Sequence, residues 1–382
     1  MRSLLTRHNR SVLADLGALR RSLAQVRPPV ELEGYRRQLT VLAGDMGVRA
    51  ERNLAYLSLG QDDILGDVLS ETQVLRRLVR LLSTLLATPV LRASESDRLC
   101  LRVIGWLHSE HADTTRYAPV FTDGAPAIRP FTDLAPIYYF PCVEQRGLLY
   151  QPLFFHEFGH LLYQLHKPEM DDLVGELQRE VTRVLAPPSR RNDRYSERQA
   201  AHRQAIADTW YSWAQELYCD AVGFHIGGPC FLRAFSAYLG ALNRGDYYRE
   251  PENLENSAHP VTWLRVRFLA AGATAAGYPE LGRGIKGEWA TTAAVLGVRE
   301  DYHGYYDPAL AAVIQRVVAD MLTEVSPRMH SQSESTGEDW SPEADSPIRL
   351  LNHAWSVYDA DPEDYAAWEA ERIALLLDPS HP

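Results

Sequence analysis

The stretch Leu153–Tyr163 constrains this chain most strongly, because it sets two histidines and a glutamate in a short apolar run as His156-Glu157-x-x-His160. In a helix, side chains four residues apart lie on one face. The two imidazoles can therefore hold one Zn²⁺, and Glu157 lies beside them to act as general base on a metal-bound water. The alternative interpretation is a helix whose two histidines face polar surroundings, and we favour the metal site.

The residues around this motif have the spacing of a core helix. The apolar positions are Leu153, Phe154, Phe158, Leu161 and Leu162. Pro152 suits the first turn of such a helix, where no backbone N–H is needed. We therefore predict a helix over residues 150–166.

A catalytic zinc usually takes three protein ligands and leaves a fourth position for water, so a third ligand must come from another element. The best candidate is the turn Glu216-Leu-Tyr-Cys-Asp220, because a helix points both carboxylates the same way. Glu216 can bind the metal while Asp220 accepts a hydrogen bond from the free N–H of a ligating histidine. A packed helix is predicted from the apolar positions Trp210, Trp213, Leu217 and Val222. An ordinary amphipathic helix with surface carboxylates is the alternative.

Composition narrows the class of protein and of partner. The chain has 382 residues, of which 46% are hydrophobic and 23% charged, as in ordinary soluble globular proteins. A net charge of −11 argues against nucleic acid or an anionic membrane surface as the main partner. We see neither a secretory signal nor a membrane span, so we expect a cytoplasmic protein. Its four widely spaced cysteines are then expected to be reduced core thiols, at Cys100, Cys142, Cys219 and Cys230.

The first 92 residues are predicted to be helical. Leucines recur with a helical period up to Arg27-Pro28-Pro29, which ends the first segment. Further helices are expected near Leu32–Ala43 and Glu71–Leu86. The last of these has a basic face, which we interpret as solvated rather than as a binding patch, formed by Arg76, Arg77 and Arg80.

Residues 97–145 have a different pattern. Tyr117–Phe121 and Ile137–Phe140 are predicted strands, because they are aromatic and β-branched and bounded by Pro and Gly. Leu99–Leu107 fits a strand or a short helix, and we favour a strand. His108 and His111 are expected in a surface turn rather than at a second metal, because no carboxylate or thiol pattern accompanies them.

The remainder of the chain is predicted to be helical with polar connections. Helices are expected near Met170–Leu185, Ser196–Gly223, Phe231–Leu242, Val261–Gly272, Lys286–Leu296, Pro308–Thr323, Ile348–Tyr358 and Pro362–Leu377. Loops are expected at 186–193 and Asn243–Ser257, and the acidic stretch Ser326–Pro347 is interpreted as a disordered linker or loop. Four regions result: a helical N-terminal region 1–95, a catalytic core 96–325, an acidic flexible segment 326–347 and C-terminal helices 348–382.

The motif His156-Glu157-x-x-His160, followed some fifty-six residues later by Glu216-x-x-x-Asp220, resembles the gluzincin group of zinc metallopeptidases, which includes thermolysin. The resemblance implies that His156, His160 and Glu216 bind zinc. It further implies that Glu157 is the general base and that Asp220 supports a ligating histidine.

A second fragment, His259-Pro260-x-x-x-x-Arg265, is similar to a segment downstream of the third ligand in the CAAX prenyl protease group. Many of those enzymes have membrane spans, which we do not expect here. Both resemblances rest on short motifs between about residues 137 and 270. The gluzincin resemblance also implies that Ile137–Phe140 is an edge strand along which an extended peptide substrate pairs.

Hydrolysis also needs a hydrogen-bond donor for the developing oxyanion. His259 is the first candidate, because Pro260 fixes a sharp turn into the next helix, and a plain helix-capping role is its alternative. Further candidates are Tyr247, Tyr248, Tyr302, His303, Tyr305 and Tyr306. Arg265 is expected either to anchor a carboxylate or phosphate or to form an internal ion pair. Cys219 is expected to be a core residue, since no base is paired with it.

The sequence therefore predicts an α+β fold that is predominantly helical, with a zincin-like metallopeptidase core, a small sheet and an N-terminal helical region. The predicted activity is zinc-dependent hydrolysis of protein or peptide substrates. One alternative is a zinc hydrolase acting on a non-protein amide, and another is a non-catalytic interaction protein that keeps the fold. The presence of Glu157 argues against the interaction protein, because a non-catalytic scaffold does not need a general base. The sequence does not indicate an oligomeric state.

Overall fold

The computed structural model describes residues 1–142, 144–185, 196–240, 247–255, 257–298, 302–335, 340–341 and 345–378. The chain forms two compact units, one of Met1–Ala125 with Arg129–Cys142 and one of Pro126–Ile128 with Val143–Pro382. The described residues are mostly helical and include a three-stranded sheet, which confirms the predominantly helical α+β prediction. The four predicted regions stay a prediction.

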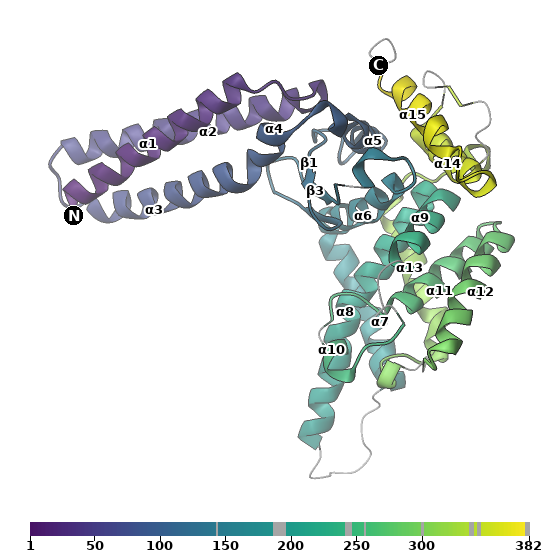
Figure 1. The fold of residues 1–382 in the computed structure, drawn as a ribbon. Coiled ribbons are helices and arrows are strands. Elements are labelled where there is room, and N and C mark those ends of the chain that lie inside the picture. Colours follow the sequence, from purple (N-terminus) through teal and green to yellow (C-terminus); the bar gives the residue numbers. More distant parts are fainter. Residues whose placement is uncertain are drawn as a thin grey trace. The chain divides into compact units, whose positions relative to one another are not determined.

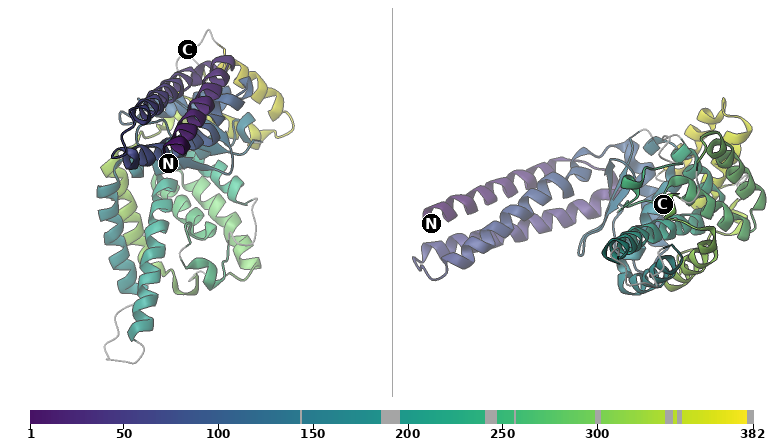
Figure 2. Two further views of the ribbon diagram at one scale, coloured as in Figure 1. Left: turned by 90° about the vertical axis from the view of Figure 1, so that its left-hand side faces the viewer. Right: turned by 90° about the horizontal axis from the view of Figure 1, so that it is seen from below.

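Three long helices of the first unit lie side by side (Figures 1 and 2). They are α1 (Arg2–Gln25), α2 (Glu33–Ser58) and α3 (Leu65–Leu81), and after a π-helical turn (Leu82–Leu86) the short α4 (Thr88–Arg92) follows. Their apolar faces are buried against one another, and three polar groups lie among them. Asn9 Nδ2 donates to Thr72 Oγ1 at 2.8 Å, and Asn53 Nδ2 donates to Asn9 Oδ1 at 3.0 Å. Such satisfied buried polar groups fix the register of packed helices.

The segment Leu99–Leu107 is helical, so the preferred strand interpretation is wrong. It lies in α5 (Arg98–Ser109), where Cys100, Ile104 and Leu107 form a buried stripe at helical spacing. In the sequence, consecutive apolar residues obscure this helical periodicity, because they fit a buried strand equally well.

The prediction of a surface turn at His108 and His111 is also wrong, because both side chains are buried. The ring of His108 packs against Tyr117 and Tyr138, and this burial lowers the pKa of His108 to about 3. His111 Nδ1 lies 2.9 Å from the carbonyl oxygen of Leu107. The two histidines are thus part of the packing at the end of α5.

The four cysteines are free thiols, as expected, but they are not all in the core. Cys100, Cys219 and Cys230 are buried, whereas Cys142 is exposed. The core prediction for Cys142 is therefore wrong. Cys142 directly follows Pro141 at the end of the last strand, where the chain leaves the sheet.

The sheet consists of β1 (Phe121–Asp123), β2 (Ala127–Arg129) and β3 (Ile137–Phe140) in the order β1-β3-β2. Strand β3 confirms the predicted bounds, and it pairs in parallel with β1, with Phe121 opposite Tyr138. Its place in the centre contradicts the expected edge strand, because β1 and β2 occupy both of its sides. Of the predicted strand Tyr117–Phe121, only Phe121 belongs to β1.

The second unit is built from helices around α8 (Ser196–Gly227). Helix α8 packs against α6 (Phe154–Leu165), α7 (Lys167–Leu185), α11 (Thr262–Ala275) and α13 (Ala311–Val325), among others. The remaining helices are α9 (Pro229–Gly240), α10 (Pro251–Leu254), α12 (Pro279–Val295), α14 (Pro347–Ala360) and α15 (Tyr365–Leu376). The predicted downstream helices are present, with bounds that differ by several residues. None of the described helices has both the length and the apolar character needed to cross a bilayer.

Short 3-10 helices complete the described elements. They lie at Val30–Leu32, Glu95–Asp97, Glu144–Arg146, Gln151–Leu153, Tyr302–Gly304, Pro308–Leu310 and Gln332–Ser335. The last of these belongs to the acidic segment, where Glu334 pairs with Arg328 at 2.6 Å and Trp340 is buried. These described parts thus contain a short helix, an ion pair and a buried aromatic side chain, and the flexible character of the segment 326–347 stays a prediction. The predicted loop 186–193 and part of the predicted loop at 243–257 lie outside the described residues.

A glycine sets the close approach of α6 to α8. A Cβ atom at Gly159 would lie 2.9 Å from the Cα and 3.1 Å from the Cβ of Cys219. Real Cβ atoms do not come this close to backbone, so only glycine lets the two helices meet here. Because Gly159 lies between the two histidines of the motif and Cys219 lies between Glu216 and Asp220, this contact sets the two motifs side by side.

We expect Gly159→Ala to destabilise the protein by about 1–3 kcal/mol, because two backbones must separate to admit the methyl group. Urea unfolding measured by circular dichroism checks this. Gly287→Ala in α12 is the matched control, since a Cβ there meets nothing within 4 Å. The control should be neutral or stabilised by up to about 1 kcal/mol. Equal free energies of unfolding for the two variants would contradict the role of Gly159 in the contact between the helices.

Candidate metal centre

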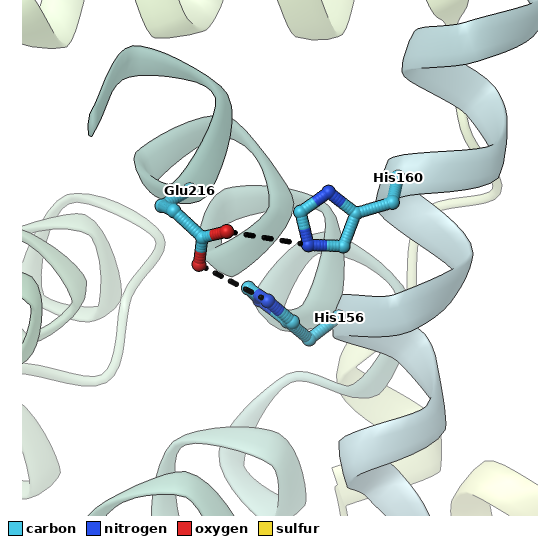
Figure 3. A group of neighbouring side chains, drawn as sticks. All are labelled: His156, His160 and Glu216. Atoms are coloured by element: carbon cyan, nitrogen blue, oxygen red, sulfur yellow. Dashed lines mark ion pairs between the residues drawn. The ribbon is translucent and has the colours of Figure 1, made fainter. Parts of the chain in front are cut away.

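Three side chains from two helices converge in the second unit (Figure 3). His156 and His160 come from α6 and Glu216 comes from α8, and one potential ligand atom of each lies within 4.8 Å of the others. Glu216 Oε2 is 3.5 Å from His156 Nε2, and Glu216 Oε1 is 3.4 Å from His160 Nε2. This group can hold a metal ion.

The spacing of these atoms suits a small divalent cation. Two ligand atoms at about 2.0–2.1 Å from a tetrahedral ion lie about 3.4 Å apart, and each of the two imidazole nitrogens lies at about this distance from one oxygen of Glu216. Glu216 Oε2 is buried and accepts no hydrogen bond from the described residues, although the guanidinium of Arg265 lies 3.2 Å away. Two imidazoles and one carboxylate also form a donor set typical of zinc. The residues therefore fit a bound metal ion.

Asp220 lies one turn after Glu216 on α8 and contacts the other ring nitrogen of His156. Its Oδ1 is 2.9 Å from His156 Nδ1, so Nε2 of the same ring is directed at Glu216. Burial opposes a charged imidazole, but the nearby carboxylates of Asp220 and Glu216 outweigh it and raise the pKa of His156 to about 10. The negative potential that holds a proton here also attracts a metal cation.

Arg265 is buried on α11 and neutralises both carboxylates. It donates two hydrogen bonds to Asp220, from Nε to Oδ2 at 2.8 Å and from Nη2 to Oδ1 at 2.6 Å. Its guanidinium also lies over the ring of Phe235, 4.9 Å from the centroid. Although burial alone raises a carboxyl pKa, this guanidinium lowers the pKa of both Glu216 and Asp220. Of the two roles expected for Arg265, the structure shows the internal ion pair.

Glu157 is also buried at this centre, next to His156 on α6. Burial, with the nearby charge of Glu216, raises the pKa of Glu157 to about 7, although His156 and Arg265 oppose the shift. A carboxyl group with a pKa near neutrality can both take up and release a proton.

The centre has a buried side and an exposed side. The side chains of His156 and Glu216 are 9% and 7% exposed, whereas His160 is 28% and His259 is 54% exposed. His259 Nε2 lies 3.5 Å from Glu216 Oε1, so the structure brings this predicted residue to the group. A solvent molecule or substrate can therefore approach the centre from the side of His160 and His259.

A small network that the sequence did not reveal fixes the backbone at His259. Arg249 Nη1 donates to the carbonyl oxygen of His259 at 2.8 Å, and Ser257 Oγ donates to the same oxygen at 2.6 Å. No periodicity or motif distinguishes Arg249 in the sequence. Phe235 was likewise missed, because in the sequence it is one more apolar residue of α9.

The other expected residues make contacts of their own. Tyr247 packs on Trp289, Tyr248 packs on His303, Tyr302 packs on Tyr306, and the carbonyl oxygen of Tyr305 accepts from Trp210 Nε1. Cys219 is fully buried, which confirms it as a core residue, and burial raises the pKa of its thiol.

Comparisons with protein-family models, with curated proteins and with solved structures gave no match. Function is therefore inferred from the geometry of this centre.

We expect Arg265→Leu to destabilise the protein by about 3–5 kcal/mol, because it leaves two buried carboxylates without their counter-charge. Arg316→Leu is the control, since Arg316 pairs with Asp320 at 3.1 Å where both side chains are about half exposed. Such an exposed pair contributes at most about 1 kcal/mol. Urea denaturation of the metal-free proteins measures the free energy of unfolding of both variants. If Arg265→Leu lowers it by less than about 1 kcal/mol, Arg265 does not stabilise the two buried carboxylates as described.

Proposed function

We propose that this protein is a zinc-dependent peptidase of the gluzincin type, with His156, His160 and Glu216 as zinc ligands. The observation that carries the proposal is the convergence of the two histidines with Glu216, beside a buried Glu157 whose pKa is about 7. A structural zinc site is usually closed by four protein ligands, whereas a catalytic one leaves a position open. Three ligand residues with an exposed side toward His259 support the catalytic kind.

The chemistry divides between the metal and the protein. Bound zinc supplies a Lewis acid that activates water and polarises the scissile carbonyl group. Glu157 takes the proton of the attacking water at its carboxylate and then delivers it to the leaving amine. The burial of Glu157 suits both steps, because burial favours the protonated form that the first step creates and the second step uses.

Two further residues have supporting roles in this proposal. Asp220 holds His156 through Nδ1 and so keeps Nε2 directed at the metal position, as carboxylates do for ligating histidines in zinc enzymes. His259, on the exposed side, donates from its ring to the carbonyl oxygen as negative charge develops there. Its position next to Glu216 and its fixed backbone support this role.

The substrate class is proposed from the motif and its chemistry. We propose protein or peptide substrates in the cytoplasm, with no nucleic acid or membrane as partner. A zinc hydrolase of a non-protein amide would use the same centre, and a non-catalytic scaffold would keep the histidines without needing Glu157.

We expect Glu157→Gln to retain zinc and abolish hydrolysis, because glutamine keeps the shape but cannot accept the proton of water. Wild-type protein and Glu157→Gln are added separately to a lysate of the source organism, and new protein N-termini are compared by mass spectrometry. Zinc is quantified on both proteins. New termini that appear only with the wild type support the peptidase and also reveal its cleavage rule.

His160→Ala is the second control, since it should lose both zinc and cleavage. Zinc on both wild type and Glu157→Gln, with no new termini from either, would count against the peptidase and favour the amide hydrolase or the scaffold. Cleavage that persists in Glu157→Gln would exclude Glu157 as the general base.

We expect Asp220→Asn to weaken zinc binding by about ten- to a hundredfold, because the partner of a ligating histidine loses its charge. Competition with a zinc-chelating dye measures this affinity. Asp171→Asn is the control. Asp171 lies on α7 and accepts hydrogen bonds from Tyr163, Tyr211 and Lys167, none of which is a proposed zinc ligand. Unchanged zinc affinity in Asp220→Asn would rule out the supporting role of Asp220.

A further inference from the structure

A groove of about 400 Å³ lies between helices α8, α11 and α13 of the second unit, and it is open to solvent at exposed lining residues such as Gly272 and Ala275. Figure 1 labels the three helices. Its lining is largely apolar. Each helix contributes residues from successive turns: Leu217 and Phe224 from α8, Phe268 and Ala275 from α11, and Ile314 and Leu322 from α13. We call this groove the three-helix slot.

The lining of the slot extends along all three helices. The lining residues named on each helix are seven or eight positions apart, which corresponds to about 10–12 Å along a helix axis. Gly272 of α11 also lines it, and a Cβ at Gly272 meets nothing within 4 Å, so the space beside it is open. A hydrocarbon chain can lie along an apolar groove whose lining extends this far.

The polar groups of the slot gather near the C-terminal end of α8. His225 and His330 both line it. His330 is held in place, with Nδ1 3.0 Å from the carbonyl oxygen of His225 and Nε2 3.0 Å from the hydroxyl of Tyr278. Burial, with the nearby His330, lowers the pKa of His225.

Charge further restricts the ligand. No lysine or arginine is among the described residues that line the slot, and its one carboxylate, Asp220, is paired with Arg265. A fully charged headgroup would therefore find no counter-charge there. An uncharged hydroxyl group needs no counter-charge, and it can form a hydrogen bond with an imidazole such as that of His225.

We propose that the three-helix slot binds one amphipathic small molecule, which has a single unbranched hydrocarbon chain and a small uncharged hydroxyl headgroup. The volume of the slot lies within the range of about 300–1,000 Å³ that is typical of small-molecule pockets. The chain lies along Leu217, Phe268 and Val318, and the headgroup lies at His225.

The slot and the metal centre share α8. Leu217, which lines the slot, directly follows the metal-site residue Glu216, and Asp220 borders both. Binding in the slot does not depend on the proposed peptidase activity, and it can be measured without any substrate.

The test uses the full-length protein, with N-phenyl-1-naphthylamine as fluorescent apolar probe and 1-decanol as competitor. Wild type should bind the probe at one saturable site and release it to 1-decanol. Gly272→Leu places a side chain in the open space of the slot, and leucine is the better helix former, so the fold is retained. This variant should weaken 1-decanol binding by at least about tenfold.

Gly287→Leu makes the same substitution on α12, where the added Cβ also meets open space, and it should bind like wild type. Ala275→Phe, one turn further along α11, is a second blocking variant and should behave as Gly272→Leu does. The proposal is overturned by the absence of saturable binding in wild type, or by wild-type affinity in both blocking variants. Equal weakening in Gly287→Leu would overturn it too, because the effect would not be local to the slot.

Discussion

One buried guanidinium, that of Arg265, neutralises the two buried carboxylates of the candidate metal centre. Arg265 reaches Asp220 with two hydrogen bonds and Glu216 with a further ion pair, so two carboxylates are buried side by side without strong mutual repulsion. Without this counter-charge, buried carboxylates would take up protons or draw in water. Because both stay ionised, Asp220 can hold His156 while Glu216 faces the two imidazoles. The geometry of the histidine motif thus depends on a residue of α11.

The backbone contact between α6 and α8 is the second condition for the centre. Gly159 and Cys219 bring the two helices so close that the residues flanking them on each helix meet across the interface. Burying several charged or titratable groups at one place is unfavourable for stability in itself. A chain usually retains such an arrangement where it serves a function, and this is consistent with the proposed hydrolase.

Local patterns predicted the parts of this structure that depend on local spacing, whereas long-range contacts decided the rest. The pairing of His156 with His160 follows from the helical repeat. Leu99–Leu107 was misjudged because its apolar residues are nearly continuous, which fits a buried strand as well as a buried helix. The central place of Ile137–Phe140 depends on which strands pair with it, and no single strand encodes that. Arg265 had two possible roles, and the burial of Asp220 beside it selects the ion pair.

The proposed chemistry depends above all on the joint binding of zinc by His156, His160 and Glu216. X-ray absorption at the zinc edge of the zinc-loaded protein tests it most directly, because it reports the elements bound to the metal and their distances. Binding by these three residues predicts only nitrogen and oxygen ligands, at about 2.0–2.2 Å, with the multiple-scattering signature of two imidazoles. A sulfur ligand at about 2.3 Å, such as Cys219 would supply, or fewer than two imidazoles would contradict it.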